Sequence, residues 1–235
     1  MTRRRWIADE YSAERAALTG EHAAHLARTL RARVGQQFEV ACGNEVRQAT
    51  VSSVSDSRVE FALGEEVSAA AAMPVTLLLA IFKFDRMEWA IEKCTELNVT
   101  SIVPVIARRT EKHLASAAEK RVERWRRIAR EASEQSRRAS TPEIGAPLKL
   151  VEALGVDAAQ KIVLAETERE LGLSEILSSS QLESLALAIG PEGGWTTEEL
   201  QSFAASKWIA ATLGDTILRA ETAAIAAMAI ARAGM

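Results

Sequence analysis

The 235-residue chain has few cysteines and histidines, and these shortages limit what it can be. Its two cysteines, Cys42 and Cys94, are far apart and form no CxxC pair, so we expect no disulfide framework. The three histidines do not have the spacing of zinc ligands, and no cysteine cluster supports them. The composition therefore predicts a metal-free protein of the reducing cytoplasm.

Long hydrophobic runs and a strong net charge are also missing. No segment approaches the roughly 18 strongly apolar residues of a membrane span, and no apolar segment follows the arginines at positions 3–5. We therefore expect neither a membrane anchor nor a signal peptide. The net charge is only −3, so any contact with nucleic acid must come from local basic patches. A hydrophobic fraction of 48 % is ample for a core.

The sequence changes character near residue 72. Before it, short β-type runs at 38–40, 46–51 and 59–63 are separated by glycine, asparagine and serine, with one helix expected at about 21–33. This spacing predicts a small antiparallel barrel or sheet. The stretch 69–74 is an expected linker, because its proline disfavours helix at the preceding residue.

Residues 73–235 alternate between predicted strands and helices. The apolar runs 75–82, 101–106, 161–165, 184–189 and 208–213 are continuous, as in parallel strands buried on both faces. With helices between them, they predict an α/β domain. Four positions are expected to begin helices: Asp85, Ser116 (a helix to about Ala139), Thr196 with Glu199 in capping-box spacing, and Asp215.

Two of these strands end in glycine-containing loops. The run 184–189 leads into Gly190-Pro191-Glu192-Gly193-Gly194, and the run 208–213 leads into Gly214. Ligands of α/β proteins bind beyond the carboxyl ends of the strands, and glycine lets the backbone approach them. If the two strands are neighbours in the sheet, we expect the two loops to form a small-molecule site. The alternative is that each loop is only a tight turn, in which glycine is needed for the backbone conformation and not for a ligand.

The loops lack the common phosphate-binding patterns. Neither a Gly-Lys-Ser/Thr sequence nor GxGxxG is present, which argues against a P-loop and against a dinucleotide site. Glu192 would also repel phosphate. A ligand with a positive centre or an adenosine edge fits this loop better, although another transferase or nucleotide enzyme of α/β type stays open.

A basic zone lies in the middle of the chain. Residues 120–138 carry eight basic and three acidic side chains. A solvated helix face is the ordinary interpretation, and an RNA backbone is the functional one. Candidate RNA-binding residues lie in this helix, upstream of it, after the strand 75–82 and near the N-terminus: Arg127, Arg130, Arg108, Arg109, Lys83, Arg86, Arg3 and Arg4.

Five segments together resemble one family. They are His25-Leu26 with Leu30-Arg31 and Gly35, the run 92–97 (EKCTEL), the run 134–138 (EQSRR) with Pro142, the run 189–194 (IGPEGG), and 213–223 with its Ile217-Leu218-Arg219 and Glu221-Thr222-Ala223. The chain resembles the bacterial ribosomal RNA small subunit methyltransferases of the E type, which belong to the SPOUT (α/β-knot) class and methylate uridine N3. The resemblance covers nearly the whole chain.

The resemblance implies a fold and a set of partners. It implies a PUA-like β-barrel for RNA binding in residues 1–72 and a methyltransferase domain with a deep trefoil knot in residues 73–235. It further implies S-adenosylmethionine as cofactor, ribosomal RNA or the small ribosomal subunit as substrate, and a homodimer. The sequence departs from the family at Asn98, where glycine is usual, at Phe84 in a KGDR-like run, and at Thr216, often arginine.

The resemblance also implies functional residues. Uridine N3 carries a proton, so the reaction needs a base or a cation that stabilises the uridine anion. No histidine lies in the cofactor-loop motifs 189–194 and 213–223. The candidates for the cation are therefore Arg219, Arg137 and Arg138, the last two as contributions of a partner subunit. The expected cofactor-binding residues are Leu164, Ala165, Glu166, Ile189, Gly190, Pro191, Glu192, Gly193, Gly194, Leu213, Gly214, Ile217, Leu218, Glu221, Thr222 and Ala223. A methyltransferase of another RNA and a non-catalytic RNA-binding module are the alternatives.

Overall fold

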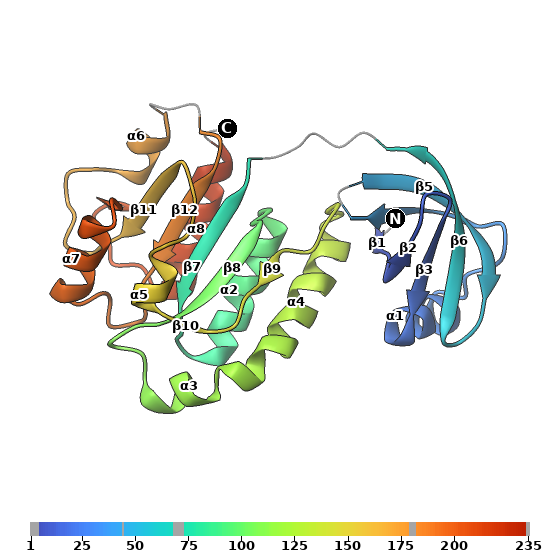
Figure 1. Ribbon diagram of the computed structural model, residues 1–235, viewed down its shortest axis with the longest axis horizontal. Helices are drawn as coiled ribbons and strands as arrows, with labels where there is room; N and C mark the ends of the chain where they lie inside the picture. Colours follow the sequence, from blue (N-terminus) through green and yellow to red (C-terminus); the bar gives the residue numbers. More distant parts are fainter. Residues whose placement is uncertain (1–4, 44, 68–72, 179–181, 234–235) are drawn as a thin grey trace. The chain divides into compact units, whose positions relative to one another are not determined.

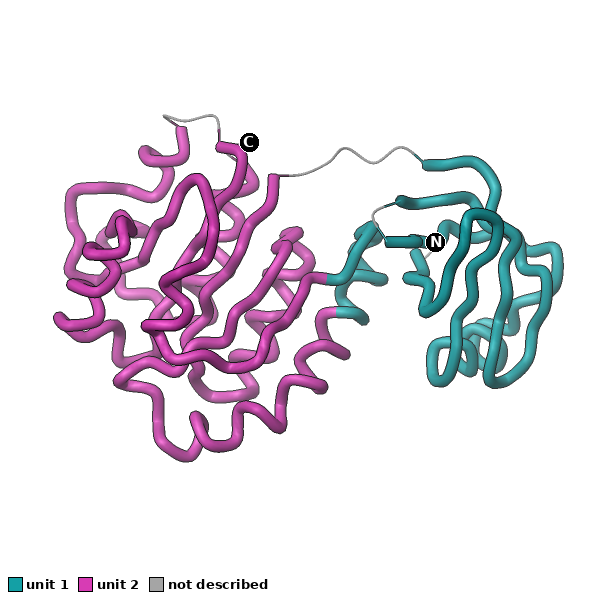
Figure 2. Tube along the Cα trace, viewed as in Figure 1, with its two compact units in different colours: residues 1–71, 130–141 teal, residues 72–129, 142–235 magenta. Residues whose placement is uncertain are grey.

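The computed structural model describes residues 5–43, 45–67, 73–178 and 182–233. The chain divides into two compact units, shown in separate colours in Figure 2. Unit 1 comprises residues 1–71 and 130–141, and unit 2 comprises residues 72–129 and 142–235. The expected linker residues 69–72, like Arg3 and Arg4, lie outside the described residues.

Unit 1 is built on one six-stranded sheet (Figure 1). Its strands are β1 (Trp6–Ile7), β2 (Glu10–Tyr11), β3 (Arg15–Thr19), β4 (Gln37–Cys42), β5 (Glu45–Val54) and β6 (Arg58–Glu66), in the order β1-β4-β5-β6-β3-β2. The expected antiparallel pairing is confirmed except at β1, which runs parallel to β4. The expected helix is a short α1 (Gly20–Ala24) followed by a π-helical turn (His25–Thr29). Trp6, Leu26 and Phe61 are buried in its core.

Within unit 1, ion pairs bind the segment 130–141 to the N-terminal residues. Arg130 lies 2.7 Å from Asp9 and also donates to the carbonyl oxygen of Ile7. Arg137 lies 3.2 Å from Glu39, which also pairs with Arg5 at 2.8 Å. The bonds of Arg130 and Arg137 join residues more than 90 positions apart, so they connect a distant part of the chain to the N-terminal strands and loops.

Unit 2 is a seven-stranded sheet in which every pairing is parallel. Its main path is β10-β8-β7-β12-β11-β13, with β9 beside β8. The bounds are β7 (Val75–Ala80), β8 (Ser101–Ile106), β9 (Glu143–Ile144), β10 (Leu148–Lys149), β11 (Gln160–Leu164), β12 (Leu185–Ile189) and β13 (Ile209–Ala211). The five expected strands are thus confirmed, and two short strands, β9 and β10, had no clear signal in the sequence.

Helices cover both faces of this sheet (Figure 1). Along β7, Leu77 and Leu79 face a core shared with α2 (Phe84–Glu96), α4 (Val122–Gln135), α6 (Leu173–Ser178) and α8 (Ala220–Ala233). Leu78 and Ala80 face the opposite core, shared with α5 (Leu150–Ala153) and α7 (Thr197–Ala205). Side chains of a strand alternate between faces, so an apolar run buried on both faces produces this three-layer arrangement.

Several helix starts differ from expectation. The N-cap of α2 is Lys83, and Asp85 lies inside the first turn, where its charge suits the helix dipole. The expected long helix from Ser116 is broken into α3 (Lys112–Ala117), a 3₁₀ turn (Glu119–Arg121) and α4, which ends at Gln135. The last helix, α8, begins at Ala220, so Asp215 lies in the preceding loop. The capping box of Thr196 and Glu199 on α7 is confirmed.

No helix among the described residues is both long and apolar enough to span a bilayer. The same residues hold no group of three side chains placed to ligate a metal ion.

Candidate functional site

Three strand ends form the candidate site. The two glycine loops follow β12 and β13, which are not paired as expected, because β11 lies between them. The end of β11 and the segment after it, from Leu164 to Arg169, therefore lie between the two loops. Since the strands are parallel, all three carboxyl ends meet at one edge of the sheet, where α/β proteins bind ligands.

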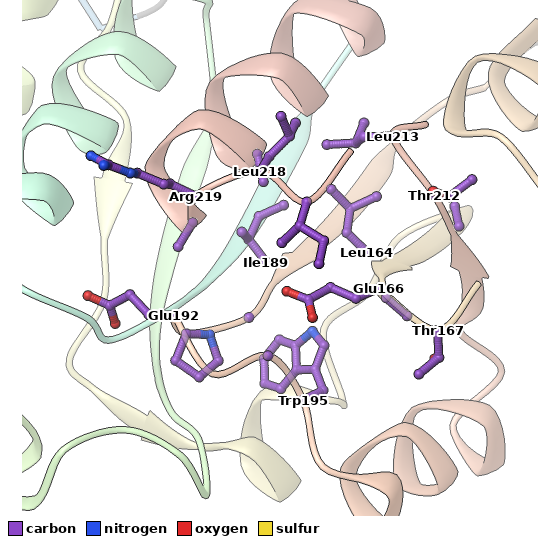
Figure 3. A pocket seen from close by; sticks show the side chains of 18 of the residues that line it. Leu164, Glu166, Thr167, Ile189, Glu192, Trp195, Thr212, Leu213, Leu218 and Arg219 are labelled. Atoms are coloured by element: carbon purple, nitrogen blue, oxygen red, sulfur yellow. The ribbon is translucent and has the colours of Figure 1, made fainter. Parts of the chain in front are cut away.

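A cavity of about 470 Å³ opens between these segments, a size common for small-molecule sites. In Figure 3, Leu164, Ile189 and Leu218 form an apolar wall, while Glu166 and Trp195 lie on the opposite side. Its lining also includes Thr167, Arg169, Gly190, Pro191, Glu192, Gly194, Thr212, Leu213, Gly214, Asp215, Thr216, Ile217, Arg219 and Ala223.

Glycine is required by geometry at three points of the cavity. Gly194 and Gly214 have φ values of +69° and +119°, which other residues adopt only with strain. A Cβ on Gly190 would lie 3.2 Å from the indole nitrogen of Trp195, so a side chain there would crowd the buried ring. The glycines therefore shape the cavity.

The loop after β13 presents free polar backbone. None of the backbone amides of residues 215–219 donates a hydrogen bond to another described residue. The indole Nε1 of Trp195 is buried and also has no partner within the described residues. Buried polar groups are normally hydrogen-bonded. These donors, together with an apolar wall, fit a ligand with a polar heteroaromatic edge.

Charges of both signs surround the cavity. The carboxylates of Glu166, Glu192 and Asp215 can face a cationic ligand group, and four arginines line the same space: Arg86, Arg109, Arg169 and Arg219. Ile217 is 77 % exposed beside them. The combination suits a ligand that carries both positive and negative groups.

Two contacts fix the loop after β12. Arg109 donates to the carbonyl oxygens of Gly193 and Trp195, and the backbone amide of Lys83, the N-cap of α2, donates to Glu192 at 3.4 Å. The buried Glu199, besides closing the capping box, accepts from the backbone amide of Arg108. The loop is therefore held from both sides by segments that follow β7 and β8.

Most predicted cofactor-binding residues line this cavity. Gly193, Glu221 and Thr222 do not, although Glu221 pairs with the lining residue Arg86 at 3.7 Å. The lining residues that lacked a prediction include Thr167, Arg169, Trp195 and Thr212. Trp195 directly follows the glycine loop, and the other three flank the ends of β11 and β13. Their position next to the expected loops is the feature of the sequence that could have predicted them.

The predicted cationic residues fall in different places. Arg219, Arg86 and Arg109 line the cavity, and Lys83 lies at the N-terminus of α2. Arg137 and Arg138 belong to unit 1, where Arg137 pairs with Glu39 and Arg138 is buried. Arg130 pairs with Asp9 in the same unit. Arg127 and Arg108 are exposed.

Much of the basic helix is balanced by acids. Arg124 forms a bidentate ion pair with Glu88 of α2, and Arg121 also lies 3.5 Å from Glu88. Arg126 bonds to Glu123 and to the carbonyl oxygen of Ile144. Within unit 2, these contacts support the interpretation of this helix as a surface helix tied to its neighbours. Arg127, which has no ion pair with a described residue, stays a candidate for RNA.

Comparisons with known proteins agree with this geometry. Residues 69–232 match the model of the RNA methyltransferase domain, which assigns the protein to that class of enzyme. The ribosomal RNA small subunit methyltransferases E of Synechocystis and Bacillus subtilis are 33 % and 31 % identical to it, each match covering 90 % of this chain and respectively 71 % and 87 % of the relative. The crystal structure of the Neisseria gonorrhoeae enzyme of that name, bound to S-adenosyl methionine, superposes with a TM-score of 0.84 at 30 % identity, covering 97 % of this chain and 95 % of that one.

The chain belongs to the ribosomal RNA small subunit methyltransferase E family. The α/β architecture expected from the sequence is confirmed by this match.

Proposed function

We propose that the protein transfers a methyl group from S-adenosylmethionine to N3 of a uridine in 16S ribosomal RNA. The observation that carries the proposal is the cavity at the ends of β11, β12 and β13, in a chain whose N. gonorrhoeae relative is described with S-adenosyl methionine bound. The activity requires access to ribosomal RNA, which agrees with a cytoplasmic protein.

The residues present fit this cofactor. The apolar wall of Leu164, Ile189 and Leu218 suits the flat adenine, and the free amides of residues 215–219 suit its polar edge. The carboxylates of Glu166, Glu192 and Asp215 suit the cationic groups. When bound, the cofactor supplies an electrophilic methyl group. The protein's part is to place the target nitrogen in line with that carbon, since positioning lowers much of the barrier.

The protein must also deal with the proton on N3. Removing it leaves negative charge on the two uracil carbonyl oxygens, and a fixed cation lowers the energy of that anion. Arg219 is our first candidate, because it lines the cavity at the start of α8. The base must leave its RNA stack to reach the site, and exposed cations such as Arg127 and Arg108 would hold the backbone.

A homodimer is part of the proposal. Arg137 and Arg138 have their described surroundings in unit 1, and a partner subunit is the route by which they would contribute to a site. The supporting feature in unit 2 is Ile217, which is apolar, 77 % exposed and beside the cavity. Sedimentation of the purified protein tests this, and a monomer under assay conditions that is fully active would contradict it.

The function is tested with labelled cofactor. The pure protein is incubated with labelled S-adenosylmethionine and with small ribosomal subunits, or naked 16S RNA, from a strain that lacks the modification. Nucleoside analysis should find label in 3-methyluridine. Cofactor binding with label in another nucleoside would redirect the proposal to a different RNA target. Absence of both binding and product would favour an RNA-binding module without catalysis.

Replacing Arg219 by alanine tests the role of this residue. We expect turnover to fall about 100-fold, while cofactor affinity changes less than about 3-fold, because the charge is needed at the uracil and not at the adenosine. Single-turnover methylation and cofactor titration measure the two effects. Arg219→Lys, which keeps the charge, should recover part of the rate. Unchanged turnover in Arg219→Ala would remove the residue from the mechanism.

A further inference from the structure

Arg86 occupies an unusual place beside the cavity. It lies in the first turn of α2 and lines the cavity, and its side chain is 32 % exposed. The positive end of a helix dipole disfavours a cation at this position. Its counterion is Glu221, whose Oε1 lies 3.7 Å from the Nε of Arg86. The dipole of α2 disfavours the charge of Arg86, so a carboxylate from another helix is needed to stabilise it.

Glu221 is buried with only partial compensation. It lies in the first turn of α8, where the dipole favours an acid, and its side chain is 4 % exposed. Its second oxygen, Oε2, has no hydrogen-bond partner among the described residues. A buried carboxylate is costly unless it is paired. Glu221 therefore holds Arg86 in place more firmly than a surface carboxylate would.

The pairing leaves most of the guanidinium available. Contact with Glu221 is through Nε, and the terminal amino groups of Arg86 form no hydrogen bond with a described residue. Arginine has five N–H donors, so several remain for a ligand. Two neighbouring arginines differ from it: Arg109 donates to loop carbonyls, and Arg219 is exposed and forms no ion pair in the described part of the chain. Within that part, Arg86 is the cavity arginine that a buried carboxylate orients.

We propose that Arg86, positioned by Glu221, is a catalytic cation that stabilises the deprotonated uracil, alongside Arg219. This inference rests on the proposed methyl transfer to uridine N3. The N3 proton leaves to water, and the charge spreads over the two carbonyl oxygens beside N3. The bond between N3 and the methyl carbon then forms as the carbon–sulfur bond of the cofactor breaks. The electron pair of the broken bond stays on the sulfur. The terminal amino groups of Arg86 donate to a uracil carbonyl oxygen, a fixed donor of the kind that stabilises developing charge.

The test compares four variants of the full-length protein. Arg86→Gln removes the cation, Arg86→Lys keeps its charge, and Glu221→Gln removes the positioning carboxylate. Lys93→Gln is the matched control, because Lys93 lies on the same helix with the same 32 % side-chain exposure and, among the described residues, pairs only with Glu92 and Glu96. Methylation of 16S RNA is followed between about pH 6 and about pH 10, the range in which uridine N3 is expected to lose its proton in or outside the site.

The expected results separate catalysis from binding. Arg86→Gln should lower kcat about 100-fold, with KM for RNA and cofactor affinity changed less than about 3-fold. Its pH–rate profile should move to higher pH, because a bound uracil without the cation loses its proton less readily. Glu221→Gln should give a smaller loss and a smaller shift in the same direction. Arg86→Lys should lie between, and Lys93→Gln should match the unmodified protein.

Each other outcome overturns a distinct claim. If Arg86→Gln raises KM for RNA and leaves kcat unchanged, Arg86 binds the RNA backbone. If the pH–rate profile does not shift, the Arg86–Glu221 pair has only a structural role. Either result contradicts the inference.

Cofactor titration verifies that each variant is folded, and if Arg86→Gln does not bind cofactor, the pH–rate profile of Arg86→Lys decides. If the unmodified protein forms no 3-methyluridine, the proposed function fails and this inference with it. If it forms that product and Arg86→Gln does so equally fast, the inference alone fails.

Discussion

At the scale of single residues, backbone conformation explains one departure from the family. Asn98 has φ +65°, in the left-handed region that glycine adopts most easily. This explains why glycine is usual there, and asparagine is among the residues that tolerate this conformation best. Phe84, another departure, is also accommodated, since it packs edge-on to Trp125 and beneath the guanidinium of Arg121. Nothing in the structure explains Thr216.

The conformation of Asn98 gives a testable difference between two substitutions. Asn98→Ala should lower the free energy of unfolding by about 1 kcal/mol, because alanine is strained at positive φ. Asn98→Gly should stay within about 0.5 kcal/mol of the original, because relief of strain offsets the greater freedom of the unfolded chain. Urea unfolding measures both. Equal stability of the two variants would show that backbone strain does not decide this position.

Gly214 allows strain and cofactor binding to be separated. Its φ is +119°, and a Cβ there would meet no atom within 4 Å; Gly35 in unit 1 shares both features, with φ +87°. Gly214→Ala and Gly35→Ala should each cost about 1–2 kcal/mol of stability. Only Gly214→Ala should also weaken cofactor binding, by about 10-fold, because it moves the loop that lines the cavity. Equal cofactor affinities in the two variants, measured by calorimetry, would contradict this role.

At the scale of elements, one arginine connects both ends of unit 2. Arg232, near the end of α8, donates to the carbonyl oxygens of Leu97 and Asn98 at the end of α2, and to that of Met73 before β7. Unpaired carbonyls at a helix end need such partners. Burial lowers the pKa of the Arg232 guanidinium below its ordinary value through desolvation. The contact closes the C-terminus of α2, whose first turn carries Arg86.

Removing this contact should destabilise the protein. Arg232→Ala is expected to lower the free energy of unfolding by about 2–3 kcal/mol, because three hydrogen bonds from a charged donor are lost. Arg28→Ala serves as the control, since Arg28 makes an exposed ion pair with Asp56 that should contribute less than about 1 kcal/mol. Thermal and urea unfolding give both values. A loss in Arg232→Ala no larger than in the control would show that water replaces the arginine.

At the scale of the whole molecule, ion pairs within unit 1 join residues 130–141 to the N-terminal sheet, and acid should weaken these pairs. Arg5, chiefly through its hydrogen bond, holds the pKa of Glu39 below its ordinary value of 4.5, and Arg137 contributes to the same shift. A lowered carboxylate pKa stabilises the folded state above the unfolded-state value. That stability is lost as the pH falls below about 4.5 toward the folded-state value.

Glu39→Gln should therefore make the stability of unit 1 depend less on pH in the acid range. The variant should be less stable than the original at neutral pH, and the difference should shrink as the pH falls below about 4.5. Hydrogen exchange of peptides from β4 and from residues 130–141 measures unit 1 directly. Glu131→Gln is the control, because Glu131 is exposed. A difference that persists unchanged at low pH would contradict the assignment of this stability to the Glu39 charge.

The sequence alone determined the five longer strands of unit 2 and the two glycine loops that line its cavity. Continuous apolar runs can be satisfied only by strands buried on both faces, and glycines at strand ends mark where a backbone must turn or approach a ligand. The two loops and the capping box of Thr196 were therefore predictable from local pattern. The trefoil knot implied by the family resemblance stays a prediction, because periodicity carries no signal of threading.

The tertiary structure decided what depends on contacts between distant residues. It placed β11 between the two loop-bearing strands, grouped residues 130–141 with the N-terminal sheet, and paired Arg86 with Glu221 across 135 positions. Strand order and ion pairing arise from long-range packing, and neither leaves a periodic trace in the sequence. The local pattern thus determined the main strands and the loops that line the cavity, whereas the fold determined which charges meet beside it.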